Sequence, residues 1–424
     1  MTETEPWTFV HAADLHIDSP LKGLARYGSA PVEAFRRATR DAFEAIVDLC
    51  IAEDARLLLL AGDVFDADWR DYNTGLFFRG QLVRLRDAGI RVFMVRGNHD
   101  ARNEVTRHLD LPEGVHEFAA DKASTVMLPE LEVAIHGQSF ATRIVTDNLA
   151  AAYPDAEPGH LNIGLLHTNV GARPGHDDYA PCSIDDLIAK GYDYWALGHV
   201  HEAEVLSRSP WIVYPGCSQG RSVRELGAKG CFVVTVEGGR VQHARHVATD
   251  AARWARERIE LSAGDDSGTL LERAAEAIGN AAAETDGRPL ALRLRVEGPL
   301  ADYAEFEGDG ERRDRLVADL RAIPQDLGED IWMEKIELAV GPDISLERLR
   351  QQGGVVSDLV ERLEELMHLE RPGEALGPML DELGKKQGVE LAALGLDAED
   401  AHAMRELLVQ VRALLMARMA GEAR

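Results

Sequence analysis

Residues 57–66 read Leu-Leu-Leu-Leu-Ala-Gly-Asp-Val-Phe-Asp, an apolar run that ends on Gly62 and Asp63. Four more apolar runs lead into a polar side chain in the same way: Phe9 to Ala13 before Asp14, Val92 to Val95 before Asn98, Ile163 to Leu166 before His167, and Tyr194 to Leu197 before His199. Short apolar runs with such boundaries indicate buried strands, and open α/β sheets bind ligands beyond the carboxyl ends of their strands. The sequence therefore predicts one site assembled from five loops.

Length and composition indicate an ordinary globular protein with more than one domain. The chain has 424 residues, of which 45% are hydrophobic and 28% charged. This length exceeds a typical single core, so we expect two or three domains. The formal charge of −27 argues against a broadly basic surface for nucleic acid or membrane. A polyanionic substrate would have to be held locally.

The cysteines and the first residues predict a cytoplasmic protein that does not associate with membranes. Cys50, Cys182, Cys217 and Cys231 show no CxxC spacing, which favours free thiols in a reducing compartment. Residues 1–7 are acidic and polar, unlike a signal peptide, and no later apolar run approaches the length of a membrane span.

The order of predicted elements indicates an α/β fold. Apolar residues recur at helical spacing over 34–53, and a second helix is expected over 72–88, so helices alternate with the first strands as in parallel βαβ units. After His201 the pattern changes to strands at 211–214, 230–237 and 240–247, with Gly238-Gly239 as a hairpin turn. We expect mostly antiparallel strands here and a first domain of residues 1–248.

Two further parts follow. Alternating strands and helices predict a small α/β domain at 249–342: strands at 258–261, 290–296 and 331–338, with helices at 269–284 and 312–323. Residues 343–424 are expected to form a helical tail with helices at 346–369, 374–386 and 398–419. Apolar stripes on the tail favour packing within the chain over docking of another protein, and both interpretations stay open.

The chemistry of the predicted site lies in four short motifs and one histidine. The motifs are Asp14-Leu15-His16, Gly62-Asp63, Gly97-Asn98-His99-Asp100 and Gly198-His199-Val200-His201, and the histidine is His167. Taken singly, these match a polar loop, a capped turn or surface histidines. Together they place oxygen and nitrogen ligands, without sulfur, after five apolar strands. Such a set suits Mn, Fe or Zn better than Ca or Mg, and it predicts a dinuclear centre.

These motifs, in this order, resemble the signature of the calcineurin-like metallophosphoesterase superfamily. The residues around Asp14 and the run Gly62-Asp63-Val64-Phe65-Asp66 most resemble the corresponding segments of the SbcD-type bacterial DNA repair exonucleases. The stretch from Tyr214 to Gly230 looks like their YhaO-type branch. The resemblance covers about the first 245 residues. It implies a four-layer β-sandwich flanked by helices, with a capping domain and a helical tail.

The resemblance also implies roles for individual residues. One metal would be held by Asp14, His16, Asp63 and His201, and a second by Asp63, Asn98, His167 and His199, with Asp63 as the bridge. His99 would stabilise and protonate the leaving group. Asp100 would orient His99, and Asp66 would have a supporting role. Gln219 and Arg221 are candidates to hold a phosphate or sugar, although a loop arginine is as often a solvated charge.

Two classes of function remain. The first is a Mn-dependent DNA nuclease that acts with an SMC-like coiled-coil ATPase of the SbcC/YhaN kind, and a homodimer is compatible with it. The second is a small-molecule phosphodiesterase or phosphatase, which the charge of −27 favours. A basic stretch of Lys22, Arg26, Arg36, Arg37 and Arg40 is the counter-argument, although a solvated helix face is the preferred interpretation. A catalytically silent scaffold is disfavoured because every ligand and His99 are present.

Overall fold

The computed structural model divides the chain into two compact units. The first comprises Met1–Ala255, Ala282–Leu292 and Glu329–Glu334, and the second comprises Arg256–Ala281, Arg293–Gly328 and Lys335–Arg424. The structure describes residues 5–19, 31–66, 71–102, 109–171, 179–305, 310–327, 330–343, 355–369, 371–387, 404–405 and 407–412. The predicted three-part division at 248 and 342 stays a prediction.

The first unit contains two six-stranded sheets. The order in one sheet is β12-β11-β1-β2-β3-β4, where β1, β2, β3 and β4 are parallel. Its strands are β1 (Trp7–Ala12), β2 (Leu57–Ala61), β3 (Arg91–Val95), β4 (Val115–Glu117), β11 (Gly230–Glu237) and β12 (Arg240–Ala248). Helices α1 (Pro31–Ala52) and α2 (Tyr72–Asp87) are the crossovers between β1, β2 and β3. The predicted βαβ units are therefore present.

The order in the other sheet is β5-β6-β7-β8-β10-β9, with β6, β7, β8 and β10 parallel. Its strands are β5 (Ser124–Leu128), β6 (Val133–Gly137), β7 (Leu161–His167), β8 (Tyr194–Gly198), β9 (Glu204–Arg208) and β10 (Trp211–Tyr214). The expectation of mostly antiparallel strands after His201 holds for β9, β11 and β12, whereas β10 also pairs in parallel with β8.

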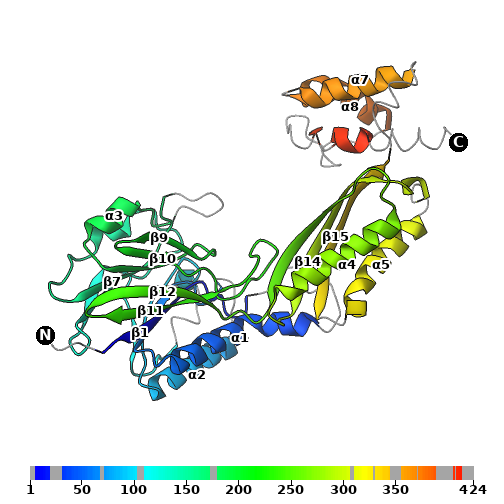
Figure 1. The fold of residues 1–424 in the computed structure, drawn as a ribbon. Helices are drawn as coiled ribbons and strands as arrows, with labels where there is room; N and C mark the ends of the chain where they lie inside the picture. Colours follow the sequence, from blue (N-terminus) through cyan, green and yellow to red (C-terminus); the bar gives the residue numbers. More distant parts are fainter. Residues whose placement is uncertain are drawn as a thin grey trace. The chain divides into compact units, whose positions relative to one another are not determined.

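Three apolar clusters make these elements a four-layer sandwich, as the sequence predicted. A central cluster combines side chains of both sheets, which include Phe9, Leu59 and Phe93 from the first and Ile163 and Leu165 from the second. The opposite face of the first sheet packs on α1 and α2. The outer face of the second sheet packs near α3 (Ile184–Ala189) and η4 (Leu149–Ala152) (Figure 1). The fold class is therefore confirmed as mixed α/β.

The hairpin between β11 and β12 shows how local sequence sets the register. Glu237 pairs with Arg240, which leaves Gly238 and Gly239 as the two turn residues, with φ of 58° and 71°. A two-residue turn with both φ values positive matches the right-handed twist of the strands and strongly favours glycine. The predicted turn is confirmed.

The second unit contains most of a three-stranded sheet, in the order β13-β14-β15. Its strands are β13 (Arg253–Glu260), β14 (Leu290–Leu300) and β15 (Ile331–Pro342), and the helices α4 (Ser267–Ala283) and α5 (Gly310–Leu327) lie beside the sheet (Figure 1). The short helix η5 (Tyr303–Glu305) follows β14. Each predicted strand and helix of this region is present, and β13, β14 and β15 are longer than predicted.

The tail is helical where the structure describes it. Helix α7 (Val355–His368) and helix α8 (Pro372–Gln387) fall within or near the predicted helices, and Pro372 begins α8 where the sequence predicted a break. Proline suits the first helical position because its missing N–H has no partner there. Residues 344–354, 388–403 and 413–424, which hold the remaining predicted helical segments, lie outside the described residues.

Two other expectations concern the cysteines and membranes. The four cysteines are free and buried, as predicted. Across the described ranges, no helix is both long and apolar enough to cross a membrane. A cytoplasmic location stays a prediction.

His11 joins the two sheets through a buried polar contact. Its Nε2 donates to the Leu197 carbonyl at 3.1 Å, so Nδ1 is the nitrogen that accepts from the Tyr194 hydroxyl, also at 3.1 Å. His11 lies on β1 and its partners lie on β8. Burial lowers the pKa of His11 to about 3, since the charged imidazolium would lose its hydration. The contact therefore depends on the neutral ring.

We expect His11→Gln to reduce the loss of stability on acidification. A glutamine can replace both hydrogen bonds without titrating, whereas His11 takes up a proton on unfolding below its usual pKa near 6.5. The His11 contribution is complete above that value and is lost as the pH falls toward 3, by up to about 1.4 kcal/mol per pH unit. Urea unfolding of metal-free wild type and variant at pH 7 and 5 measures the difference. Equal pH dependence in both proteins would contradict the assignment.

Candidate metal centre

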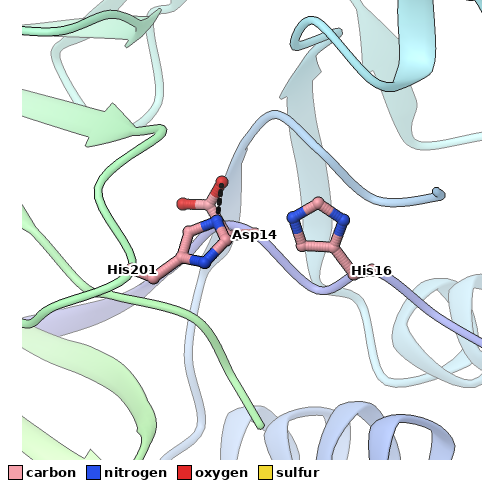
Figure 2. A group of neighbouring side chains, drawn as sticks. All are labelled: Asp14, His16 and His201. Atoms are coloured by element: carbon pink, nitrogen blue, oxygen red, sulfur yellow. Dashed lines mark ion pairs between the residues drawn. The ribbon is translucent and has the colours of Figure 1, made fainter. Parts of the chain in front are cut away.

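Asp14, His16 and His201 form one half of the predicted centre. Asp14 and His16 follow β1, and His201 follows β8. One ligand atom of each residue lies within 4.8 Å of the others, and His201 Nε2 is 3.8 Å from Asp14 Oδ1 (Figure 2). Figure 2 shows the side chains of the two histidines on either side of the Asp14 backbone. The two sheets therefore bring together residues that are almost 190 positions apart.

The backbone at these positions is in an unusual conformation. Asp14, His16 and Asp63 have φ values of 51°, 43° and 51°, and His199 has 102°. Positive φ costs energy in non-glycine residues and persists only where the surroundings enforce it. Backbone bonds from Asp14 N to Gly62 O and from His16 N to Asp63 O, both 3.0 Å, tie the two loops together. This backbone conformation directs the side chains at the strand ends toward the site.

Asp63 lies between the two halves of the site. Its Oδ2 is 3.9 Å from His16 Nε2 and 3.5 Å from His167 Nε2. His167 Nε2 is in turn 3.0 Å from Asn98 Oδ1, and the ring centroids of His167 and His199 are 5.2 Å apart. Asp14, Asp63 and His167 also form a compact ligand group. The structure thus brings all seven predicted metal ligands together, and the position of Asp63 suits a bridge.

Hydrogen bonds set the orientation of two ligand imidazoles. His167 Nδ1 donates to the Ala61 carbonyl at 2.9 Å, and His201 Nδ1 donates to Glu225 Oε1 at 2.7 Å. In both residues the proton on Nδ1 leaves Nε2 with its lone pair facing the site. Histidines that bind metals are commonly oriented in this way by a carbonyl or carboxylate at the other ring nitrogen.

Burial at the site destabilises charged side chains that have no compensating charge beside them. Burial and then the charge of Asp63 raise the pKa of Asp14 well above its usual range. Burial and then Arg221 lower the pKa of His16, and within the described chain neither ring nitrogen of His16 has a hydrogen-bond partner. Adjacent buried carboxylates beside a neutral imidazole with unused lone pairs are the environment that a cation stabilises. The residues therefore fit divalent metal ions.

The residue that orients His99 is a correction to the sequence analysis. His99 Nδ1 donates to Asp66 Oδ1 at 2.6 Å, where Asp100 was expected. The Asp100 carboxylate accepts instead from the backbone N–H groups of Val64, Phe65 and Gly97. Asp100 is fully buried, and burial and then Asp63 raise its pKa to about 7. Asp100 thus joins the loops after β2 and β3, and Asp66 is the carboxylate at His99 Nδ1.

His99 and Asp66 form a polarised pair. Burial is the largest influence and lowers the pKa of His99, but the hydrogen bond to Asp66 and the charges of the nearby carboxylates together outweigh it and raise that pKa. Burial would raise the pKa of Asp66, yet the bonds from His99 and Ser19 hold it below its usual range. The His99 side chain is 32% exposed, so it remains accessible to a substrate.

Gln219 is a second correction. Its buried side chain accepts from the backbone N–H groups of Ala251 and Ala252, and it donates to the carbonyls of Ala252 and Gly220. All the capacity of the amide is used to join two backbone segments, so Gln219 supports the loop and does not bind substrate. The sequence could not reveal this because the partners are backbone atoms.

Arg221 lies beside His201 at the site, and its role in substrate binding stays a prediction. Its Nη2 is 3.0 Å from Glu225 Oε1 and its Nη1 is 3.5 Å from Ser19 Oγ. Ser19 in turn donates to Asp66 Oδ2 at 2.6 Å. Sequence analysis missed both Glu225 and Ser19. The sequence contains only a weak indication of these two residues, as a carboxylate four residues after Arg221 and a hydroxyl three residues after His16.

The basic stretch gives no free patch where the structure describes it. Arg40 pairs with Asp18 and Arg37 lies 3.6 Å from Asp41, as a solvated or structural face would. Lys22 and Arg26 lie outside the described residues.

Comparison with known proteins identifies the family. A model described as calcineurin-like phosphoesterase matches residues 8–203, and one described as metallophosphoesterase YhaO, middle domain, matches residues 254–341. The Bacillus subtilis (strain 168) protein named uncharacterized metallophosphoesterase YhaO is 32% identical over 300 residues, which cover 70% of this chain and 73% of that protein. The chain belongs to the YhaO-type calcineurin-like metallophosphoesterases. Members of this family bind two divalent metals, which agrees with the two halves of the site.

More distant relatives carry a name connected with DNA. A protein of Methanopyrus kandleri named DNA double-strand break repair protein Mre11 is 27% identical over 295 residues, which cover 62% of this chain and 60% of that protein. The protein of the same name from Thermoplasma acidophilum is 22% identical over 345 residues, which cover 76% of this chain and 88% of that protein. This metallophosphoesterase therefore resembles them well beyond the residues of the metal centre.

We expect Gly97→Ala to weaken metal binding at least tenfold. A Cβ at Gly97 would collide with Asp63 Oδ1 and would lie 2.8 Å from His167 Cε1, which displaces two candidate ligands. Gly80→Ala is the matched control, because Gly80 lies in α2 with open space where a Cβ would be. Calorimetric titration of each metal-free protein with Mn²⁺ measures the effect. Unchanged binding by Gly97→Ala would contradict this placement of the centre.

Proposed function

We propose that this metallophosphoesterase is a Mn-dependent DNA nuclease of DNA repair that hydrolyses phosphodiester bonds. The observation that carries the proposal is the His99–Asp66 pair beside a complete set of ligands for two metals. The similarity to proteins named DNA double-strand break repair protein Mre11 supports DNA as the substrate.

The proposed ligand assignment follows the two halves of the site. Asp14, His16, Asp63 and His201 would hold one metal, and Asp63, Asn98, His167 and His199 would hold the other. Two bound divalent ions supply Lewis acidity, lower the pKa of a water nucleophile and orient a phosphoryl group for in-line displacement. Mn²⁺ is our choice, with Fe and Zn as alternatives, because the ligands are carboxylate, amide and imidazole.

The residues around this centre provide acid catalysis and charge stabilisation. His99, held through Nδ1 by Asp66, would present Nε2 to the scissile phosphate and donate a proton to the leaving oxygen. Arg221, held by Glu225 beside Ser19, adds positive charge on the same side of the site. Asp100 supports the two loops that carry Asp63 and His99.

We also propose a partner, an SMC-like coiled-coil ATPase of the SbcC/YhaN kind, which would bind the helical tail within residues 343–424. Helices α7 and α8 expose large apolar side chains, which include Leu359 at 43% and Met379 at 62% exposure. An amphipathic helix with such side chains suits a helical partner. A homodimer and a cytoplasmic location are compatible with this proposal, and residues 249–342 would form the capping domain.

A small-molecule phosphodiesterase or phosphatase is the second candidate. The charge of −27 favours it, since duplex DNA binding draws most of its affinity from cationic contacts with phosphates. The same metal centre can serve several phosphoesters, so the fold does not decide between them.

We expect wild type with Mn²⁺ to degrade linear DNA and Asp63→Ala to be inactive. For His99→Ala we expect a fall of about 10²–10⁴ in kcat, because the proton donor is lost. A fluorescent linear DNA and a chromogenic phosphodiester are compared, with Mn content measured for each protein. The Mn content of His99→Ala should equal that of wild type. Phosphodiester turnover without DNA cleavage would favour the small-molecule candidate, and full activity of His99→Ala would refute the acid role.

We expect Met379→Asp to weaken binding of the coiled-coil ATPase without changing hydrolysis of the chromogenic phosphodiester. Ile144→Asp is the matched control, because Ile144 is equally exposed at 62% but lies in the first unit. Co-elution of purified ATPase with each protein in size-exclusion chromatography measures binding. Equal co-elution of both variants with wild type would contradict docking through α8.

A further inference from the structure

Glu225 is a charged residue in contact with the metal centre, and the proposed function uses it only to hold Arg221. It follows β10 in a loop that turns through a bond from Glu225 N to Ser222 O at 2.9 Å. Its side chain is only 12% exposed, and its two oxygens have different partners. Oε1 accepts from His201 Nδ1 at 2.7 Å, and Oε2 accepts from Arg221 N at 2.7 Å.

The protein holds this carboxylate firmly in place. The Arg221 side chain contacts Glu225 Oε1 at 3.0 Å, and a Cβ on Gly220 would lie 2.5 Å from the Glu225 carbonyl, so the loop is closely packed. Gln219 ties the start of the same loop to Ala251 and Ala252. A carboxylate fixed in this way determines where the His201 ring can lie.

His201 needs such a support more than His167 does. The His201 side chain is 25% exposed, whereas that of His167 is fully buried and its Nδ1 bonds a backbone carbonyl of β2. A half-buried imidazole at a loop position would otherwise exchange rotamers and tautomers, and only one combination directs the Nε2 lone pair toward Asp14. Arg221 Nη2 also approaches His201 Nδ1, at 3.3 Å, but both would be donors there, so Glu225 rather than Arg221 accepts the proton.

We infer that Glu225 is a positioning residue for the metal held by His201, and that it fixes the Nδ1–H tautomer and the ring orientation of that ligand. The inference rests on the proposed assignment of His201 to the first metal. It does not depend on DNA being the substrate. Glu225 also holds the Arg221 guanidinium, so one carboxylate sets the positions of a metal ligand and of a positive charge at the same site.

Titration of metal-free full-length protein with Mn²⁺ tests the inference. Wild type should bind two ions. Glu225→Ala should weaken one of the two sites by about 10–100-fold and leave the other near its original affinity. Glu225→Gln should stay closer to wild type, because its amide oxygen can still accept from His201 Nδ1. Glu202→Gln is the matched control, since it removes a nearby carboxylate that pairs with Lys229 and is 74% exposed.

Two further variants separate orientation from charge. Glu225→Asp keeps the charge but is one methylene too short for the same contact, so it should resemble Glu225→Ala. Arg221→Ala should weaken Mn²⁺ affinity less than Glu225→Ala does, because the backbone N–H of residue 221, which bonds Glu225 Oε2, remains and the Glu225 carboxylate is still present. Thermal melts of the metal-free proteins establish that the variants fold, and the Asp and Gln variants still decide the question if Glu225→Ala does not.

Two outcomes would overturn the inference. One is wild-type affinity at both sites in Glu225→Ala or Glu225→Asp, and the other is a loss in Glu225→Gln as large as in Glu225→Ala, which indicates a purely electrostatic effect. Imidazole ¹⁵N spectra of metal-free protein provide a second readout, with His201 identified by comparison with His201→Gln. The Nδ1–H tautomer should dominate in wild type and decline in Glu225→Ala. All these measurements remain informative if DNA is not cleaved.

Discussion

Two carboxylates that should repel each other, Asp14 and Asp63, are buried side by side at the ends of adjacent parallel strands. Burial, and then the charge of Asp63, raises the pKa of Asp14, and little water remains to screen the two charges from each other. Such an arrangement destabilises a protein unless a cation or a proton compensates it. The surrounding structure keeps both groups in place, with strained backbone at each residue and loops tied together by hydrogen bonds.

The packing of the two sheets explains how Asp14 and Asp63 are held close together with the other candidate ligands. Each sheet alone supplies only part of the ligand set, since Asp14, Asp63 and Asn98 follow strands of the first sheet and His167, His199 and His201 follow or end strands of the second. The central apolar cluster fixes the distance between the sheets, and His11 fixes their alignment through β8. Packing in the core therefore sets the separation of ligands at the edge. A metal centre of this kind depends on the whole first unit.

The sequence predicted the ligands well because ligand positions depend on strand ends, which apolar runs reveal. Four strands that are short or flank the sheets were missed: β4, β5, β6 and β9. Strands β4, β5 and β9 are partly exposed along most of their length, whereas β6 is a short buried run that includes His136. The runs that carry ligands are buried on both faces, so their signal is continuous.

The roles of supporting residues were harder to predict than the ligands. Asp100 follows His99 directly in the sequence and Asp66 lies 33 positions earlier, yet the path of the backbone brings Asp66 to His99 Nδ1. Gln219 bonds backbone atoms, and Glu225 reaches His201 from a loop that follows another strand. Hydrogen bonds to backbone and contacts between loops leave no periodic pattern. Residue type and spacing therefore define what a site can bind, while the fold defines what orients each ligand.

The net charge of the chain and the charges at the site both affect how the protein would bind a polyanion. A protein with a formal charge of −27 attracts divalent cations and repels polyanions over most of its surface. At the centre, bound cations would reverse the local sign, and Arg221 and His99 would add to that reversal within a few ångströms of the scissile bond. Affinity for a phosphodiester would then depend mainly on the loaded centre and on few contacts elsewhere. A long polyanion would be held mainly at one phosphate, so a partner that supplies the missing cationic surface would extend the choice of substrate from short phosphodiesters to DNA.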